Sequence, residues 1–233
     1  NPDLVLIDTQ IVAGAPVEFL IAGIGDALAT WVEARAAARG NGTTMNGGHP
    51  TRAGGALAKL CWDILWEHSF AAIDSVKAGV VTPALDAVVE ANTLLSGLGF
   101  ESGGLAAAHA IHDGLTAAEQ THGLTHGQKV NVGTCAQLIM EGADAEEIED
   151  FIAFTTKVGL PNSLTEVGLS PDDTEELEAV AKAATAEDET IHNMPFPVTP
   201  ELVVDALVSL ESISRRVRED RGLPEPVKYV AEH

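Results

Sequence analysis

Apolar residues recur at helical spacing along most of this chain, and no other feature limits its possible folds as strongly. After Pro16 they fall three and four residues apart in one segment after another, and Gly- and Pro-containing breaks separate these segments. The pattern predicts an all-α, multi-helix domain with little material for a sheet. The expected helices cover about 17–39, 57–76, 83–95, 105–116, 130–140 and 145–158, with two more that begin near 171 and 200.

Capping residues mark where several of these helices begin. Thr82 and Thr199 each precede a proline, which suits the first turn of a helix. Asp144 and Glu147 have the spacing of a capping box in front of an apolar run. These signals support the periodicity and set the expected helix starts.

One apolar run near the beginning of the chain does not fit the helical pattern. Residues 4–7 (LVLI) read as a short buried strand, and a buried strand needs neighbours on both sides. Few other segments read as strands. We therefore expect residues 1–13 to be a remnant strand of a missing α/β nucleotide-binding domain, and residues 14–233 to form the helical domain.

The charge of the chain excludes several classes of partner. With 35 acidic and 13 basic residues the formal net charge is −22, which repels nucleic-acid phosphates and anionic membrane surfaces. No uncharged apolar run approaches the roughly 20 residues that a spanning helix needs. Two cysteines far apart give no disulfide framework. We expect no nucleic acid and no membrane as partners, and a cytoplasmic location.

The acidic residues are spread over the whole length and lysines are few. Dispersed acid suits a protein whose self-repulsion is screened by salt. Our hypothesis is a cytosol of high ionic strength, as in a halophilic microbe, and the alternative is a merely acidic protein.

Histidines supply the strongest local signal for chemistry. Four of the eight fall close together, at His109, His112, His122 and His126. His109 and His112 share one face of a predicted helix, while His122 and His126 flank the start of the next one. Neutral imidazole is a common metal ligand, so the cluster indicates either a metal site or a set of polar helix-end histidines.

Asp26 is the best carboxylate candidate for the same site. It interrupts an apolar stretch of a predicted helix, where a charge is costly unless it is paired or bound to a metal. The alternative is a side chain turned toward solvent. Three protein ligands and one open position are typical of catalytic zinc.

Four segments resemble the glycerol dehydrogenase family of the iron-containing (group III) alcohol dehydrogenase superfamily. They are GIGDALAT at 23–30, GLGFESGGLAAAHAIH at 97–112, HGQKV at 126–130 and TIHNMP at 190–195. The resemblance implies the helical metal-binding domain of that superfamily, which is the dehydroquinate synthase-like C-terminal domain. It also implies metal ligands at Asp26, His109 and His126, with no catalytic residue beyond these ligands.

The resemblance further implies a reaction and its cofactors. Thr30 stands where many iron-dependent relatives have a further histidine, so zinc is expected rather than iron. The implied reaction is the NAD-dependent oxidation of glycerol, or a similar small diol, to dihydroxyacetone in a homo-oligomeric enzyme. The glycine-rich phosphate turn of the family is not found, so cofactor-binding residues stay unassigned. We expect this chain to be truncated, to bind zinc, and to be inactive alone.

Two other readings of the sequence stay open. One is an sn-glycerol-1-phosphate dehydrogenase, which resembles the same superfamily but must hold a phosphate, and Lys129 is the nearest lysine to the predicted site. The other is a non-catalytic helical fragment that acts in assembly.

Overall fold

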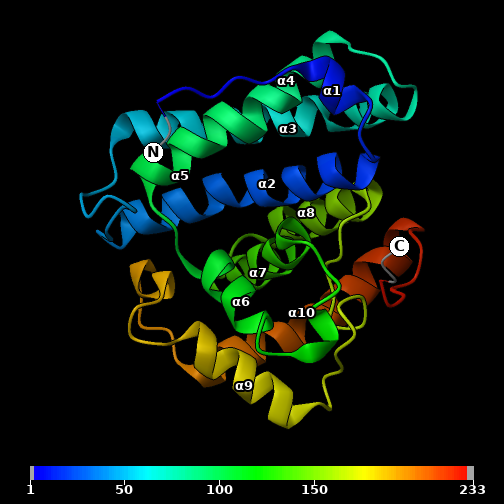
Figure 1. Cartoon of the computed structure of the whole chain (residues 1–233). Coiled ribbons are helices and arrows are strands. Elements are labelled where there is room, and N and C mark those ends of the chain that lie inside the picture. The colour runs from blue at the N-terminus through cyan, green and yellow to red at the C-terminus, as the bar shows by residue number, and fades with distance from the viewer. Residues whose placement is uncertain (1–2, 230–233) are drawn as a thin grey trace.

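The computed structural model describes residues 3–229, and this part of the chain is helical, with no strand (Figure 1). The prediction of an all-α fold is confirmed. The α-helices are α1 (Thr9–Ala13), α2 (Val17–Arg39), α3 (Arg52–Lys77), α4 (Pro83–Glu90), α5 (Ser96–Gly103), α6 (Ala107–Leu115), α7 (His126–Met140), α8 (Ala145–Val158), α9 (Thr174–Ala184) and α10 (Pro200–Arg221). A π-helical turn (Ala91–Leu95) joins α4 to α5, and two 3₁₀ turns (Glu119–Thr121 and Thr190–Asn193) lie between later helices.

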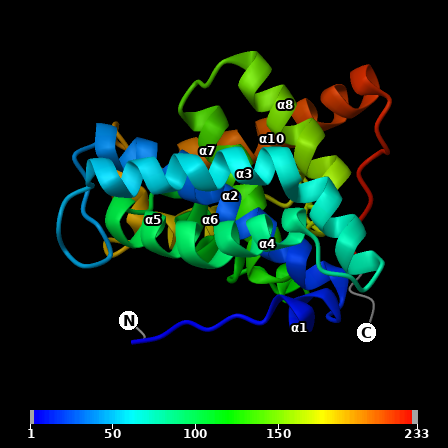
Figure 2. The same ribbon diagram turned by 90° about the horizontal axis from the view of Figure 1, so that it is seen from above.

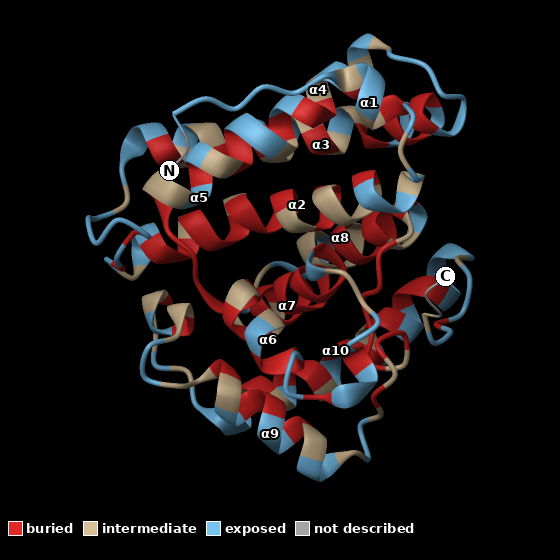
Figure 3. Cartoon of the chain, in the orientation of Figure 1, coloured by how far each residue is buried: buried red, intermediate tan, exposed pale blue. Residues whose placement is uncertain are grey.

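Helix α2 runs through the middle of the molecule and separates two groups of helices (Figure 1). On one side it packs against α3 and α5, and on the other against α7, which in turn packs against α6 and α10. Figure 3 shows long buried stretches on α2 and α7. None of the described helices is long and apolar enough to span a bilayer.

Small residues let α2 and α7 approach each other closely. Gly25 on α2 faces Gly127 on α7, so that a Cβ on Gly25 would lie 2.7 Å from the Gly127 carbonyl oxygen. A Cβ on Gly127 would in turn overlap the carbonyl oxygen of Ala22. Only glycine permits this backbone contact, and the residues that follow Gly25 and precede Gly127 are Asp26 and His126.

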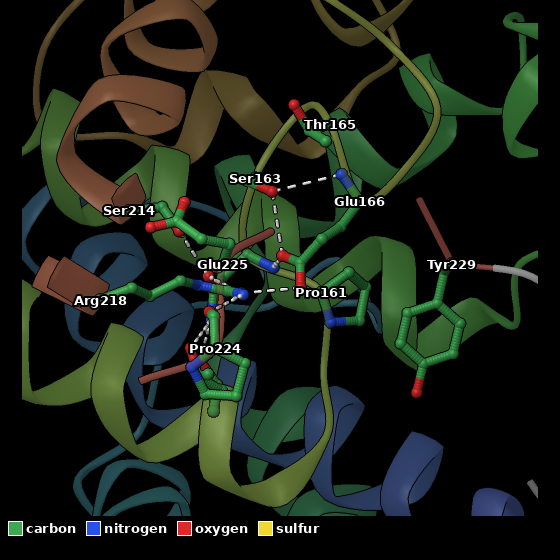
Figure 4. A network of polar contacts seen from close by, with 12 residues as sticks. Pro161, Ser163, Thr165, Glu166, Ser214, Arg218, Pro224, Glu225 and Tyr229 are labelled. Atoms are coloured by element: carbon green, nitrogen blue, oxygen red, sulfur yellow. Dashed lines mark hydrogen bonds and ion pairs between the residues drawn. The ribbon is translucent and has the colours of Figure 1, made fainter. Parts of the chain in front are cut away.

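A buried polar network ties α10 to the loop before α9 (Figure 4). Arg218 on α10 donates to Glu166 (2.7 Å) and to Asn162 (2.9 Å), and Ser214 also donates to Asn162 (2.8 Å). The Tyr229 amide then donates to the carbonyl oxygen of Glu166. A buried ion pair is stabilising only when hydrogen bonds satisfy its remaining polar groups. Here hydrogen bonds satisfy most of these groups. The network holds the segment that follows α8 against α10.

The predicted strand at residues 4–7 is wrong in the structure. Leu4 and Leu6 are 77% and 86% exposed, and residues 4–8 have no regular secondary structure. Figure 2 shows the segment running along the outside of the helices. A strand needs a neighbour for its N–H and C=O groups, and no other described segment is a strand. Residues 9–13, expected in the same remnant, form α1, which Asp8 caps.

We expect Gly127→Ala to disturb both folding and the neighbouring side chains. The new methyl group collides with the Ala22 carbonyl, and overpacking of this kind costs about 1–3 kcal/mol of unfolding free energy. Thermal and urea unfolding followed by circular dichroism measure the loss. Gly123→Ala is the matched control, because nothing lies within 4 Å of a Cβ there. Equal stability of the two variants would contradict the close crossing.

Candidate metal centre

Three helices each bring one donor side chain to the same point. Asp26 lies in the middle of α2, His109 in the first turn of α6, and His126 is the first residue of α7. Nε2 of His109 lies 3.2 Å from Asp26 Oδ1, and Nε2 of His126 lies 3.1 Å from the same oxygen. One ligand atom from each residue falls within 4.8 Å of the others. The structure thus brings together the three residues that the sequence nominated.

Local structure explains why each side chain arrives there. The glycine contact between α2 and α7 brings the backbone beside Asp26 up to the start of α7. That start is fixed by a capping box, in which Thr125 accepts from the Gln128 amide and the Gln128 side chain accepts from the Thr125 amide. His126 therefore projects from a well-defined helix N-terminus.

His109 is held from two sides. Its Nε2 faces Asp26, while its Nδ1 donates a hydrogen bond of 2.5 Å to Glu33 Oε2. Glu33 lies two turns after Asp26 on α2 and its side chain is completely buried. Glu33 was not among the site residues predicted from the sequence. The available signal was its spacing of seven residues from Asp26, which places both on one face of the helix.

The charges in the cluster shift the pKa values of its members. Burial acts to raise the pKa of Asp26, but hydrogen bonds and the charges of His109 and His126 outweigh it, and the pKa falls well below its usual range. Burial acts to lower the pKa of His109, but Glu33 and Asp26 outweigh it and raise the pKa to about 10. In the metal-free chain His109 is therefore protonated at neutral pH.

The other two closely spaced histidines, His112 and His122, are not among the possible ligands. The ring of His112 lies 4.2 Å from that of His126, centroid to centroid, and its Nδ1 contacts Asp113. Burial and the charge of His126 lower the pKa of His112 to about 4. His122 Nε2 donates to the Thr116 carbonyl instead of pointing at the cluster. Neither belongs to the group of possible ligands found among the described residues.

The donor set suits a zinc ion. Two ligands at about 2.0–2.1 Å from a tetrahedral zinc lie about 3.3 Å apart, close to the measured oxygen–nitrogen separations of 3.1 and 3.2 Å. Asp26 and His126 keep 40% and 51% of their side chains exposed, so one side of the cluster is open. Thr30 offers no further ligand, because it is buried and its hydroxyl pairs with that of Ser96.

Comparison with known proteins agrees with the resemblance read from the sequence. The chain is 54% identical over 219 residues to a glycolaldehyde reductase of Halobacterium salinarum, covering 94% of this chain and 60% of that protein. It is 52% identical over 220 residues to a glycerol dehydrogenase of Escherichia coli, again covering 94% of this chain and 60% of the relative. No family model matches the chain. The chain thus spans about 60% of the length of these curated relatives.

Solved structures give the same result for the fold. The glycerol dehydrogenase of Schizosaccharomyces pombe superposes with a TM-score of 0.95 at 44% identity, over 100% of this chain and 60% of that one. An iron-containing alcohol dehydrogenase of Thermococcus thioreducens shares the fold with a TM-score of 0.65 at 17% identity, over 91% of this chain and 55% of that one. Over nearly its whole length the chain is therefore homologous to a part of glycerol dehydrogenases, and it shares the fold of that part.

Proposed function

We propose that this chain supplies the metal-binding part of an NAD-dependent dehydrogenase that oxidises glycerol, or a similar small diol, with zinc held by Asp26, His109 and His126. The observation that carries the proposal is the meeting of one carboxylate and two imidazoles from three helices. Relatives at 52% identity that are named glycerol dehydrogenases support the choice of substrate.

The chain's own residues would prepare this site in defined ways. Asp26 supplies a negative charge that balances part of a divalent cation, and the two histidines supply neutral nitrogen donors. The exposed side of Asp26 and His126 leaves room for a small alcohol. A bound zinc ion would act as a Lewis acid on the alcohol oxygen.

The described residues do not contain the usual dinucleotide-binding motif. That motif needs a strand, a glycine-rich turn and a helix in sequence, whereas residues 3–229 contain no strand. NAD is therefore proposed for the complete enzyme, and we assign no residue of this chain to it.

A second candidate substrate is glycolaldehyde. The relative at 54% identity is named glycolaldehyde reductase, and reduction of a small hydroxyaldehyde needs the same open metal position. A phosphorylated substrate is less suited, because Lys129 is buried and offers no exposed cation beside the candidate metal site. Parallel assays of the chain co-expressed with a nucleotide-binding domain, with glycerol plus NAD and with glycolaldehyde plus NADH, separate the two candidates.

Zinc binding should release protons and strengthen as the pH rises. His109, with a pKa of about 10 in the metal-free chain, carries a proton at neutral pH that must leave before Nε2 can bind a metal. Raising the pH therefore favours the complex, by up to about tenfold in affinity per pH unit for one proton. Calorimetry in buffers of different ionisation enthalpy counts the protons released.

Single substitutions test whether zinc binds at the cluster of Asp26, His109 and His126. We expect His126→Ala to lose most of the affinity, while His122→Ala, a matched control in the segment just before α7, keeps both the affinity and the proton release. Zinc binding that is independent of pH, or insensitive to the loss of His126, would refute the proposed ligand set.

We expect the zinc-loaded chain alone to form no NADH from glycerol, because the motif that positions a dinucleotide is not found in its described part. Absorbance at the NADH band measures turnover, with the chain alone and with a co-expressed nucleotide-binding domain. Full activity of the chain by itself would contradict this expectation.

We also propose that the protein works in a cytosol of high ionic strength. At a net charge of −22 the folded chain repels itself, and at 1 M salt the screening length falls to about 3 Å. The melting temperature should therefore rise with the KCl concentration. A neutral osmolyte at equal osmolality is the control, because it does not screen charge. Highest stability in low salt would count against a halophilic origin.

A further inference from the structure

The helix that carries His109 has no cap of its own. Its N-cap position is Ala106, which has no side-chain hydrogen-bond acceptor, and its first turn is buried. The N–H groups at such an end must find partners, because a buried unpaired amide is costly. Here the partners come from other helices.

Two buried side chains satisfy all of these amides. Glu33 Oε1 on α2 accepts from the amides of Ala106 (2.9 Å) and His109 (3.0 Å). Gln137 Oε1 on α7 accepts from the amides of Ala107 and Ala108, both at 2.9 Å. Both side chains are fully buried. A carboxylate at this end is also favoured by the helix dipole.

Glu33 differs from Gln137 in one respect. Its second oxygen, Oε2, accepts from Nδ1 of the His109 ring, whereas the amide nitrogen of Gln137 donates to the Val32 carbonyl and to Glu141. One carboxylate thus fixes both the backbone and the ring of His109. Gln137 holds only the backbone of the two preceding residues.

We propose that Glu33 is a positioning residue of the metal centre, which keeps the His109 proton on Nδ1 and leaves the Nε2 lone pair directed at the cation. This inference rests on the proposed metal site. Ligand histidines commonly donate their other ring N–H to a carboxylate, and loss of that partner typically weakens metal binding 10- to 100-fold. Glu33 and Asp26 flank the ring on opposite sides, and their two charges match a divalent cation with neutral imidazoles.

Glu33→Gln separates positioning from simple capping. The amide oxygen of glutamine can still accept from the Ala106 and His109 amides, so the cap persists. Its NH₂ group, however, faces Nδ1 as a donor. The ring must then present a lone pair at Nδ1 and carry its proton on Nε2, the nitrogen that faces Asp26.

The test is the zinc affinity of the whole 233-residue chain, measured by competition with a chromogenic chelator. We expect Glu33→Gln to weaken binding about 10- to 100-fold while the helical content of the metal-free chain is unchanged. Gln137→Leu is the matched control, because it removes a buried cap from the same helix without touching the ring. It should lower the melting temperature but change the zinc affinity less than about threefold.

A second measurement does not depend on any variant. In ¹⁵N-histidine spectra of the zinc-loaded wild type, His109 should carry its proton on Nδ1 and bind through Nε2. The opposite tautomer would overturn the role of Glu33, as would equal zinc affinity of Glu33→Gln and wild type, or an equal loss in Gln137→Leu. Failure of the wild-type chain to bind zinc would overturn the metal site itself, and with it this role.

Discussion

The contact between Gly25 on α2 and Gly127 on α7 is the constraint on which the rest of the site depends. Because neither residue has a side chain, the two backbones touch where larger residues would collide. Asp26 follows Gly25 and His126 precedes Gly127, so their separation of 3.1 Å follows from this crossing. A metal centre requires its ligand side chains to be held close to one geometry. Here the crossing of α2 and α7 sets the relative position of two of them.

The second requirement is that polar groups buried between the helices are satisfied. Glu33 and Gln137 replace the cap that Ala106 cannot provide, and Arg218 with Glu166 fixes the segment that packs against α10. Such groups destabilise a core when they lack partners and specify one arrangement when they have them. The acidic, alanine-rich helices thus obtain a unique packing partly from a few buried polar side chains that are mostly hydrogen-bonded.

The helices were predictable because their signals are local. Periodicity, and the caps at Thr82 and Thr199, are read from neighbouring residues, and both caps form in the structure. Where a tertiary contact competes, local signals fail. Asp144 makes no side-chain cap, and its expected partner Glu147 pairs with Arg35 on α2 instead.

The predicted ligands Asp26, His109 and His126 meet in space, although periodicity and spacing alone left a solvent-facing aspartate and polar helix-end histidines open. Its spacing from Asp26 was the one signal for Glu33, and this spacing alone does not distinguish a functional carboxylate from the other acids of the chain. Its burial and its bond to His109 arise only when α2 packs on α6, and that contact is between residues 76 positions apart. Functional carboxylates of this kind are invisible to composition and appear only once the helices are assembled.

The cluster of donor side chains is assembled entirely from helices of this chain. All three donors, the glycine crossing and the Glu33 support come from α2, α6 and α7, whose mutual contacts lie within the described residues. The curated relatives are longer, and this chain spans about 60% of them. The described residues contain no strand and so lack the strand and glycine-rich turn of the usual dinucleotide-binding motif, which means that the donor cluster and that motif do not occur together in this part of the chain.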